Sequence, residues 1–283
     1  MLRRVIFVFF LCIGQFVFGK EQRIVTLNTA ITETVFGLGL GEFVVATDVT
    51  SISPKAAAAL PKVSRNRSLS AEGIMAFKPT IVLVATGDMS KTVVQQLRKA
   101  GINVVQIQQE FTAKGAFRFM QEIADALSAP AVGKSVVERT KLAYDRVIEN
   151  IAKENQGKKS PKVLFIYARG TGTMSVAGKG SSLDAMIELA GAKNAIQEFA
   201  DFKPYTTEAL VQANPDVILM FDFGASSLGG KDEILKMPGV RLTEAGKQKR
   251  ILVMNASLLV NFSTRLPEAI TELHKGLTIS MAH

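Results

Sequence analysis

The chain has 283 residues, of which 47% are hydrophobic, and a formal net charge of +9. This length suits two α/β domains or one large one, with enough apolar residues for two cores. The basic residues are dispersed, tryptophan is absent and aromatic residues make up 7%, so the composition argues against nucleic-acid binding and fits a basic cleft for an anionic small molecule.

The first 19 residues, 1–19, have the pattern of a secretory signal peptide. Residues 2–4 give a basic start, residues 5–13 are apolar but shorter than a membrane span, and Gly19 is a small residue at a plausible cleavage site. Removal of this segment would leave the mature protein in the periplasm. The single cysteine, Cys12, lies inside the segment, without the small preceding residues that lipid attachment needs. The mature chain is therefore expected to lack disulfides, thiolate metal sites and cysteine nucleophiles.

Strand and helix patterns alternate along residues 20–129. Short apolar runs predict strands at residues 23–27, 43–47, 80–85 and 103–107. Amphipathic segments predict helices at residues 29–38, 70–77, 91–100 and 113–127. The polar segment 51–68 contains Pro54 and Pro61 and is expected to be mostly loop.

A long helix is predicted over residues 131–156, after Pro130 as a favourable first helical residue. Its apolar positions are spaced by three or four residues on one helical face: Val132, Val136, Thr140, Ala143, Val147 and Ile151. Gly157 follows as a stop signal. At about 1.5 Å per residue, such a helix is a rod of roughly 39 Å, longer than any other helix that the sequence predicts.

The alternation resumes after the rod. Strands are expected at residues 162–167, 173–176, 216–221 and 250–255. Helices are expected at residues 182–190, 206–213, 231–236 and 265–279. Strands that alternate with helices on both sides of the rod predict an α/β fold with parallel sheets covered on both faces.

The two halves contain an ungapped internal match. Residues 69–84 (LSAEGIMAFKPTIVLV) align with residues 205–220 (YTTEALVQANPDVILM), each reading as a capped short helix, a proline and a buried strand. The match predicts an N-terminal lobe (20–129), an interlobe helix (130–157) and a C-terminal lobe (158–283). The alternative is that any short helix–strand unit looks like this.

The match pairs Glu72 with Glu208. Each glutamate lies in the first turn of its predicted helix. A negative charge there stabilises the helix through its dipole, whether or not the glutamate has a function. The functional alternative is that one carboxylate in each lobe marks where a partner protein contacts both lobes.

Several stretches carry a resemblance to a known family: LPKVSRNRSLSAEGI (60–74), SVAGKGSSLDAMIELAGAKNAI (175–196), FKPYTTEALVQANPDVIL (202–219) and TRLPEAI (264–270). With the leader and the long helix, they make the chain similar to substrate-binding proteins of ABC importers for iron chelates and cobalamin, and more narrowly to the periplasmic haem-binding branch. The resemblance implies two Rossmann-like lobes on a rigid helix, with the ligand between them. It also implies that Glu72 and Glu208 dock on arginines of the permease.

In one respect the chain departs from that family. The resemblance implies an axial tyrosine for haem iron in the first lobe, where this chain has Arg65, and in some members a histidine near the position of Arg169. The two histidines, His274 and His283, are near the C-terminus and are not expected to be ligands. The remaining candidates are Tyr167, Tyr205 and Met174, for each of which ordinary packing is the alternative.

Four arginines are candidates to line the expected cleft. Arg65, Arg67, Arg169 and Arg265 are at positions that the resemblance turns toward the cleft. A guanidinium pairs with carboxylates in bidentate fashion and stacks on flat π-systems, which suits an anionic tetrapyrrole. The alternative for each is a solvated surface arginine. The predicted ligand-binding residues are therefore Arg65, Arg67, Tyr167, Arg169, Tyr205 and Arg265.

An enzyme is not expected. The chain lacks a plausible His–Ser–Asp set and clustered metal ligands. Residues 170–182 resemble a phosphate-binding loop, but five residues instead of four separate Gly172 from Gly178, and Gly180 replaces the hydroxyl residue that holds Mg²⁺. We expect a monomeric carrier with no intrinsic cofactor and with haem as its transported ligand. A ferric-siderophore or cobalamin carrier is the alternative, and a receptor-linked sensor is a third class.

Overall fold

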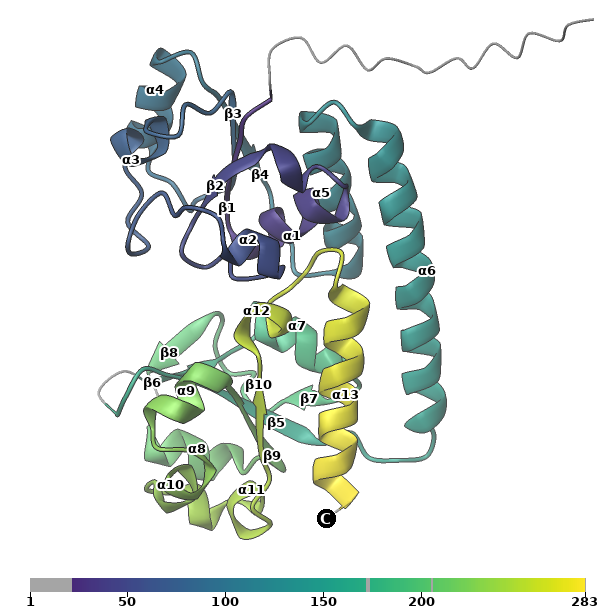
Figure 1. Ribbon diagram of the computed structural model, residues 1–283. Coiled ribbons are helices and arrows are strands. Elements are labelled where there is room, and N and C mark those ends of the chain that lie inside the picture. The colour runs from purple at the N-terminus through teal and green to yellow at the C-terminus, as the bar shows by residue number, and fades with distance from the viewer. Residues whose placement is uncertain (1–21, 172–173, 205, 283) are drawn as a thin grey trace, which may run out of the picture.

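The computed structural model describes residues 22–171, 174–204 and 206–282, which form two lobes beside one long helix. This helix, α6 (Pro130–Glu154), runs along both lobes (Figure 1). It begins at the predicted proline and ends within two residues of the predicted position. Among the described residues, no helix is long and apolar enough to cross a membrane.

The N-terminal lobe contains a four-stranded parallel sheet in the order β2-β1-β3-β4. Its strands are β1 (Ile24–Leu27), β2 (Val44–Thr47), β3 (Ile81–Ala85) and β4 (Asn103–Ile107). Because side chains alternate along a strand, Ile81 and Leu83 pack on one face of the sheet and Val82 and Val84 on the other.

Helices cover both faces of this sheet (Figure 1). The first face packs against α1 (Thr29–Gly37) and α5 (Ala113–Ala126), and α5 in turn packs against α6. The opposite face packs against α3 (Ala71–Met75) and α4 (Lys91–Lys99). Strands buried on both faces give the continuous apolar runs seen in the sequence.

The C-terminal lobe contains a six-stranded sheet in the order β10-β9-β5-β6-β8, with β7 also paired to β5. Its strands are β5 (Lys162–Ala168), β6 (Met174–Ala177), β7 (Lys193–Asn194), β8 (Phe202–Pro204), β9 (Val217–Phe221) and β10 (Ile251–Met254). The helices of this lobe are α7 (Ser182–Leu189), α8 (Thr207–Ala213), α9 (Asp222–Ser227), α10 (Lys231–Lys236), α11 (Glu244–Lys247), α12 (Ala256–Leu259) and α13 (Leu266–Ala282).

The predicted parallel pairing holds throughout the first sheet and for β10, β9, β5 and β7 in the second. However, β6 is antiparallel to both β5 and β8. The connection from β5 to β6 spans only residues 169–173, which is too short for the crossover of a dozen or more residues that a parallel pair requires. The predicted loop 51–68 also contains a short helix, α2 (Lys55–Ala58).

The repeat predicted from the sequence has matching local structure in the two lobes. The Ser70 side chain caps α3 by accepting from the backbone N–H of Gly73, and the Thr206 side chain caps α8 by accepting from that of Ala209. Each short helix is therefore held by a hydroxyl cap and leads into a buried strand, β3 or β9.

Candidate functional site

Two adjoining cavities lie where the lobes face each other. One has a volume of about 1040 Å³ and contains Tyr167, Phe221 and Phe223; we call it the aromatic compartment. The other has a volume of about 510 Å³ and is lined mainly by polar residues; we call it the polar compartment. Five residues line both: Thr29, Thr50, Arg67, Ser257 and Val260. Both cavities lie beyond the carboxyl ends of parallel strands, the usual ligand position in such sheets.

One wall of the aromatic compartment is a ring cluster from the C-terminal lobe. The Tyr167 ring meets the Phe223 ring edge to face, with centroids 5.8 Å apart, and Phe221 lies 5.4 Å from Phe223. Across the cavity, the Ile52 side chain from the N-terminal lobe is 55% exposed. An apolar surface of this kind, left open to solvent between two lobes, indicates a ligand-binding site.

Three of the four predicted arginines line the aromatic compartment. Arg65 and Arg67 come from the N-terminal lobe, on a turn in which the Asn66 side chain accepts from the backbone N–H of Ser68 at 2.8 Å. Arg169 comes from the C-terminal lobe, and its guanidinium lies 5.3 Å from the centroid of the Phe223 ring. The cavity therefore has cations on both sides.

Tyr167 and Arg169 act as a pair. The Arg169 Nε–H donates to the Tyr167 phenolic oxygen at 2.7 Å. Tyr167 is near the end of β5 and Arg169 is the first residue after it, and both side chains line the compartment. This hydrogen bond fixes the Tyr167 hydroxyl beside a permanent positive charge at the cavity wall.

Arg265 differs from the other three arginines and lines neither compartment. Its guanidinium donates to Glu268 at 2.6 and 2.7 Å and to Glu33 of the N-terminal lobe at 3.0 Å. Its hydrogen bonds to Glu268, and then its attraction to Glu33, raise its pKa above the ordinary value. The expectation that Arg265 offers a free cation to the cleft is therefore corrected, because two carboxylates of the protein already use its charge.

Glu33 is only 4% exposed. Burial raises the pKa of this carboxyl group, while a hydrogen bond from Ser53 and the Arg265 guanidinium act in the opposite direction. The Asn261 side chain, from the C-terminal lobe, also donates to Glu33. Glu33 therefore accepts hydrogen bonds across the lobe interface.

The other candidates from the sequence lie elsewhere. Tyr205 is outside the described residues. Met174 is partly buried and packs against the core of the C-terminal lobe. His274 lines neither compartment, and its Nδ1 lies 2.9 Å from the Ala190 carbonyl oxygen and its Nε2 3.0 Å from Glu154. Among the described residues, no three His, Cys, Asp or Glu side chains converge to hold a metal ion.

Glu72 and Glu208 are exposed, in the first turns of α3 and α8. Both lie outside the two compartments. Both side chains are accessible to solvent at these positions, and their docking role stays a prediction.

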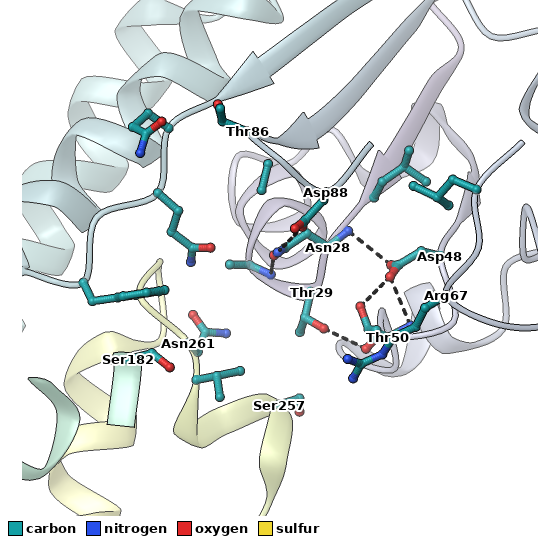
Figure 2. Close-up of a pocket in the computed structure, with 18 residues that line it drawn as sticks. Asn28, Thr29, Asp48, Thr50, Arg67, Thr86, Asp88, Ser182, Ser257 and Asn261 are labelled. Atoms are coloured by element: carbon teal, nitrogen blue, oxygen red, sulfur yellow. Dashed lines mark hydrogen bonds between the residues drawn. The ribbon is translucent and has the colours of Figure 1, made fainter. Parts of the chain in front are cut away.

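Sequence reasoning missed the polar compartment. Figure 2 shows Asn28 between Asp88 and Asp48. The Asn28 amide Nδ2 donates to Asp88 at 3.4 Å and its backbone N–H donates to Asp48 at 3.2 Å. Asp48 also accepts from Thr50 and Ser51 hydroxyls at 2.5 Å, which fixes its orientation. The available signal was positional, because each of the three residues follows a predicted strand closely.

Asp88 is the freer of the two carboxylates. Partial burial raises its pKa above the ordinary value, a hydrogen bond from Asn28 lowers it, the neighbouring Asp48 raises it and Arg67 lowers it. Negative charge is therefore concentrated in the polar compartment, and Arg67 lies on its boundary with the aromatic compartment.

Comparison with known proteins gives a consistent result. The periplasmic haem-binding protein BhuT, in a structure with two haems, is 34% identical to this chain, with a TM-score of 0.88, covering 92% of this chain and 99% of that one. The apo form of the periplasmic haem-binding protein RhuT from Roseiflexus sp. RS-1 is 33% identical, with a TM-score of 0.87 and the same coverage.

Curated sequences are similar at lower identity. The ABC transporter substrate-binding lipoprotein YvrC of Bacillus subtilis is 26% identical over 91% of this chain and 80% of its own length. A vitamin B12-binding protein of Salmonella paratyphi A is 27% identical over 76% of this chain and 75% of its own length. Residues 24–258 match the family described as periplasmic binding protein. With its two lobes, its single long helix and its interlobe cleft, the chain belongs to the periplasmic binding protein family.

Proposed function

We propose that this protein is an extracytoplasmic solute-binding protein that captures haem in the interlobe cleft and delivers it to an ABC importer. The observation that carries this proposal is the aromatic compartment, where the ring cluster and Arg169 of one lobe face Arg65 and Arg67 of the other. Haem is a flat apolar ring with two carboxylates, so it needs apolar contact along its faces and cations at one edge. The similarity to three solved periplasmic haem-binding proteins supports the same ligand.

Iron coordination is the second part of the proposal. Among the described residues, Tyr167 is the tyrosine that lines the aromatic compartment. Its phenolic oxygen accepts a hydrogen bond from Arg169. We therefore assign to Tyr167 the role of axial ligand, from the C-terminal lobe. Arg65 cannot take that role, because a guanidinium has no lone pair to give and stays protonated. Arg65 and Arg67 are left to bind the ligand carboxylates.

Delivery is assigned to the matched glutamates. Glu72 and Glu208 are exposed, one on each lobe, and would pair with basic residues of the permease. A substrate-binding protein of this kind acts outside the cytoplasm and has no catalytic role. We expect a monomer, because one chain supplies both walls of the cleft.

The alternative is a cobalamin or ferric-siderophore carrier. The vitamin B12-binding relatives favour cobalamin as the specific competitor, and the polar compartment could accept amide groups. Direct titration separates these ligands. The mature protein would be titrated with hemin, metal-free protoporphyrin, cyanocobalamin and a ferric siderophore, with absorbance and thermal melting as readouts.

The proposal predicts a shifted hemin absorption band at saturation and a rise in melting temperature that depends on hemin concentration. Cobalamin should give neither effect at the same concentration. Tighter binding of cobalamin than of hemin would refute the haem assignment and leave the carrier class intact.

A further inference from the structure

The two compartments differ in charge. Three arginines line the aromatic compartment, where the one acidic residue lining it, Asp222, accepts from the Asn255 amide at 3.0 Å. Asp48 and Asp88 line the polar compartment, and among the described residues lining it Arg67 is the only cation. The ligand cavity therefore changes from cationic to anionic along its length.

A ligand that fills both compartments must match this change. Like charges brought together at an interface weaken binding and so give specificity against the wrong partner. The carboxylates of haem are both on one edge of its ring, and the opposite edge carries uncharged vinyl groups. The carboxylate edge fits against the arginines, and the vinyl edge fits beside the aspartates.

Resting on the proposed haem function, we infer that Asp88, supported by Asp48, selects porphyrins that carry carboxylates on one edge only. A ring with carboxylates on opposite edges would bring an anion beside Asp88 in every orientation that satisfies the arginines. The polar compartment thereby acts as an electrostatic filter among tetrapyrroles.

The positions of the side chains support this role. In Figure 2 Asp88 and Asp48 flank Asn28 at the upper wall of the cavity, and Ser182, Ser257 and Asn261 lie on the opposite lobe. These residues offer neutral hydrogen-bonding groups and no positive charge to an incoming carboxylate. The Thr50 and Ser51 hydroxyls donate to Asp48 and hold its carboxylate in this orientation.

Asp88 is the better residue to test. Among the described residues its side chain accepts one hydrogen bond, from Asn28 at 3.4 Å; this bond is long, so a change there should disturb the fold little. Asp48, in contrast, holds the segment after β2 through several bonds. Asp88→Asn removes the charge and keeps the size, and Asp88→Glu keeps the charge.

The experiment compares hemin with ferric coproporphyrin III, which has the same iron and ring but carboxylates on both edges. Dissociation constants would be measured by absorbance titration of the mature protein and its variants. Wild type should prefer hemin by at least about tenfold, and Asp88→Asn should shrink that ratio by on the order of tenfold. Asp88→Glu should retain the preference.

The matched control is Glu42→Gln, which removes the same charge from a surface residue that lines neither compartment. It should leave both affinities unchanged. Equal affinity of wild type for the two porphyrins, or an unchanged ratio in Asp88→Asn, would overturn the inference while hemin binding itself stands. Failure of wild type to bind hemin would instead overturn the proposed function, and this inference with it.

Discussion

Glu33 and Arg265 form an ion pair of 3.0 Å between the two lobes, 232 residues apart in the sequence. The Glu33 side chain is 3% exposed and that of Arg265 is 32% exposed. Asn261 donates to the same carboxylate and also lines the polar compartment. Asn261 thus connects this contact between the lobes to the ligand cavity.

Arg265→Met should destabilise the protein by roughly 2–4 kcal/mol near neutral pH, because it leaves a buried carboxylate without its cation. The loss should shrink on acidification. Burial already raises the pKa of Glu33 above its ordinary value of 4.5, so the folded state takes up this proton at a higher pH than the unfolded chain. The penalty for the charged form is therefore full at high pH and is relieved as the pH falls through the folded-state pKa.

Urea unfolding at about pH 7.5 and about pH 5.5 would measure this effect. The double variant Glu33→Gln with Arg265→Met is the control, since it removes both charges and should recover much of the loss at the higher pH. An equal loss for the single variant at both pH values would argue against a charged Glu33 in the interface.

Tyr167→Phe should weaken hemin binding by at least about tenfold and leave metal-free protoporphyrin nearly unaffected, because only hemin can use the phenolic oxygen. Absorbance titration with both porphyrins gives the two constants. The tyrosinate-to-iron absorption band should vanish from the hemin complex. If the band persists in Tyr167→Phe, another residue binds the iron.

Arg65→Ala, in contrast to Tyr167→Phe, should weaken the binding of hemin and of metal-free protoporphyrin equally. Losing a hydrogen bond to a charged group costs about 1.5–3 kcal/mol, or roughly ten- to a hundredfold in affinity. Since both porphyrins carry the carboxylates, both should lose that factor. Arg65→Lys, which keeps the charge without the bidentate fork, should lie in between. A loss confined to hemin would show that Arg65 acts through the iron.

The docking proposal predicts that Glu72→Ala with Glu208→Ala abolishes transport and leaves hemin affinity intact. Both carboxylates are exposed and lie outside the cavities, so neither folding nor binding should depend on them. ATPase stimulation of the reconstituted importer would be the measurement. Each single variant should show a partial loss, and normal stimulation by the double variant would contradict the docking role.

Lobe movement on binding should be small. The rigid helix α6 joins the lobes along one side, and the Glu33–Arg265 contact joins them directly. Solution scattering profiles of the free and hemin-bound protein should nearly superimpose. Closure by tens of degrees would mean that the contact breaks in the free protein.

Local patterns predicted much of this molecule. The α6 apolar repeat, the proline at its start, and the caps at Ser70 and Thr206 depend on neighbours in the sequence. The antiparallel placement of β6 and β8 depends on pairing between distant segments, so alternation of strands and helices could not reveal it. The Tyr167–Arg169 pair could not be read from strand alternation, because β5 ends at Ala168 and Arg169 lies in the turn that follows.

Arg265 shows where sequence reasoning fails for the site. It has the same chemistry as Arg65 and Arg169, and the only nearby signal that its guanidinium is paired is Glu268, three residues further on, to which it donates at 2.6 and 2.7 Å. Its second partner, Glu33, lies 232 residues away and is brought to it only by the fold. A site defined between two lobes therefore needs the long-range contacts before its free charges can be identified.

The reversal at β6 also determines how the second sheet ends. Its outer strand, β8, has only three residues, all exposed, with Lys203 in the middle and Pro204 as the last. A short edge with a charge and a residue that lacks an N–H is a poor template for another chain. A secreted carrier must stay dispersed while its cleft exposes aromatic rings, and this edge removes one route to aggregation.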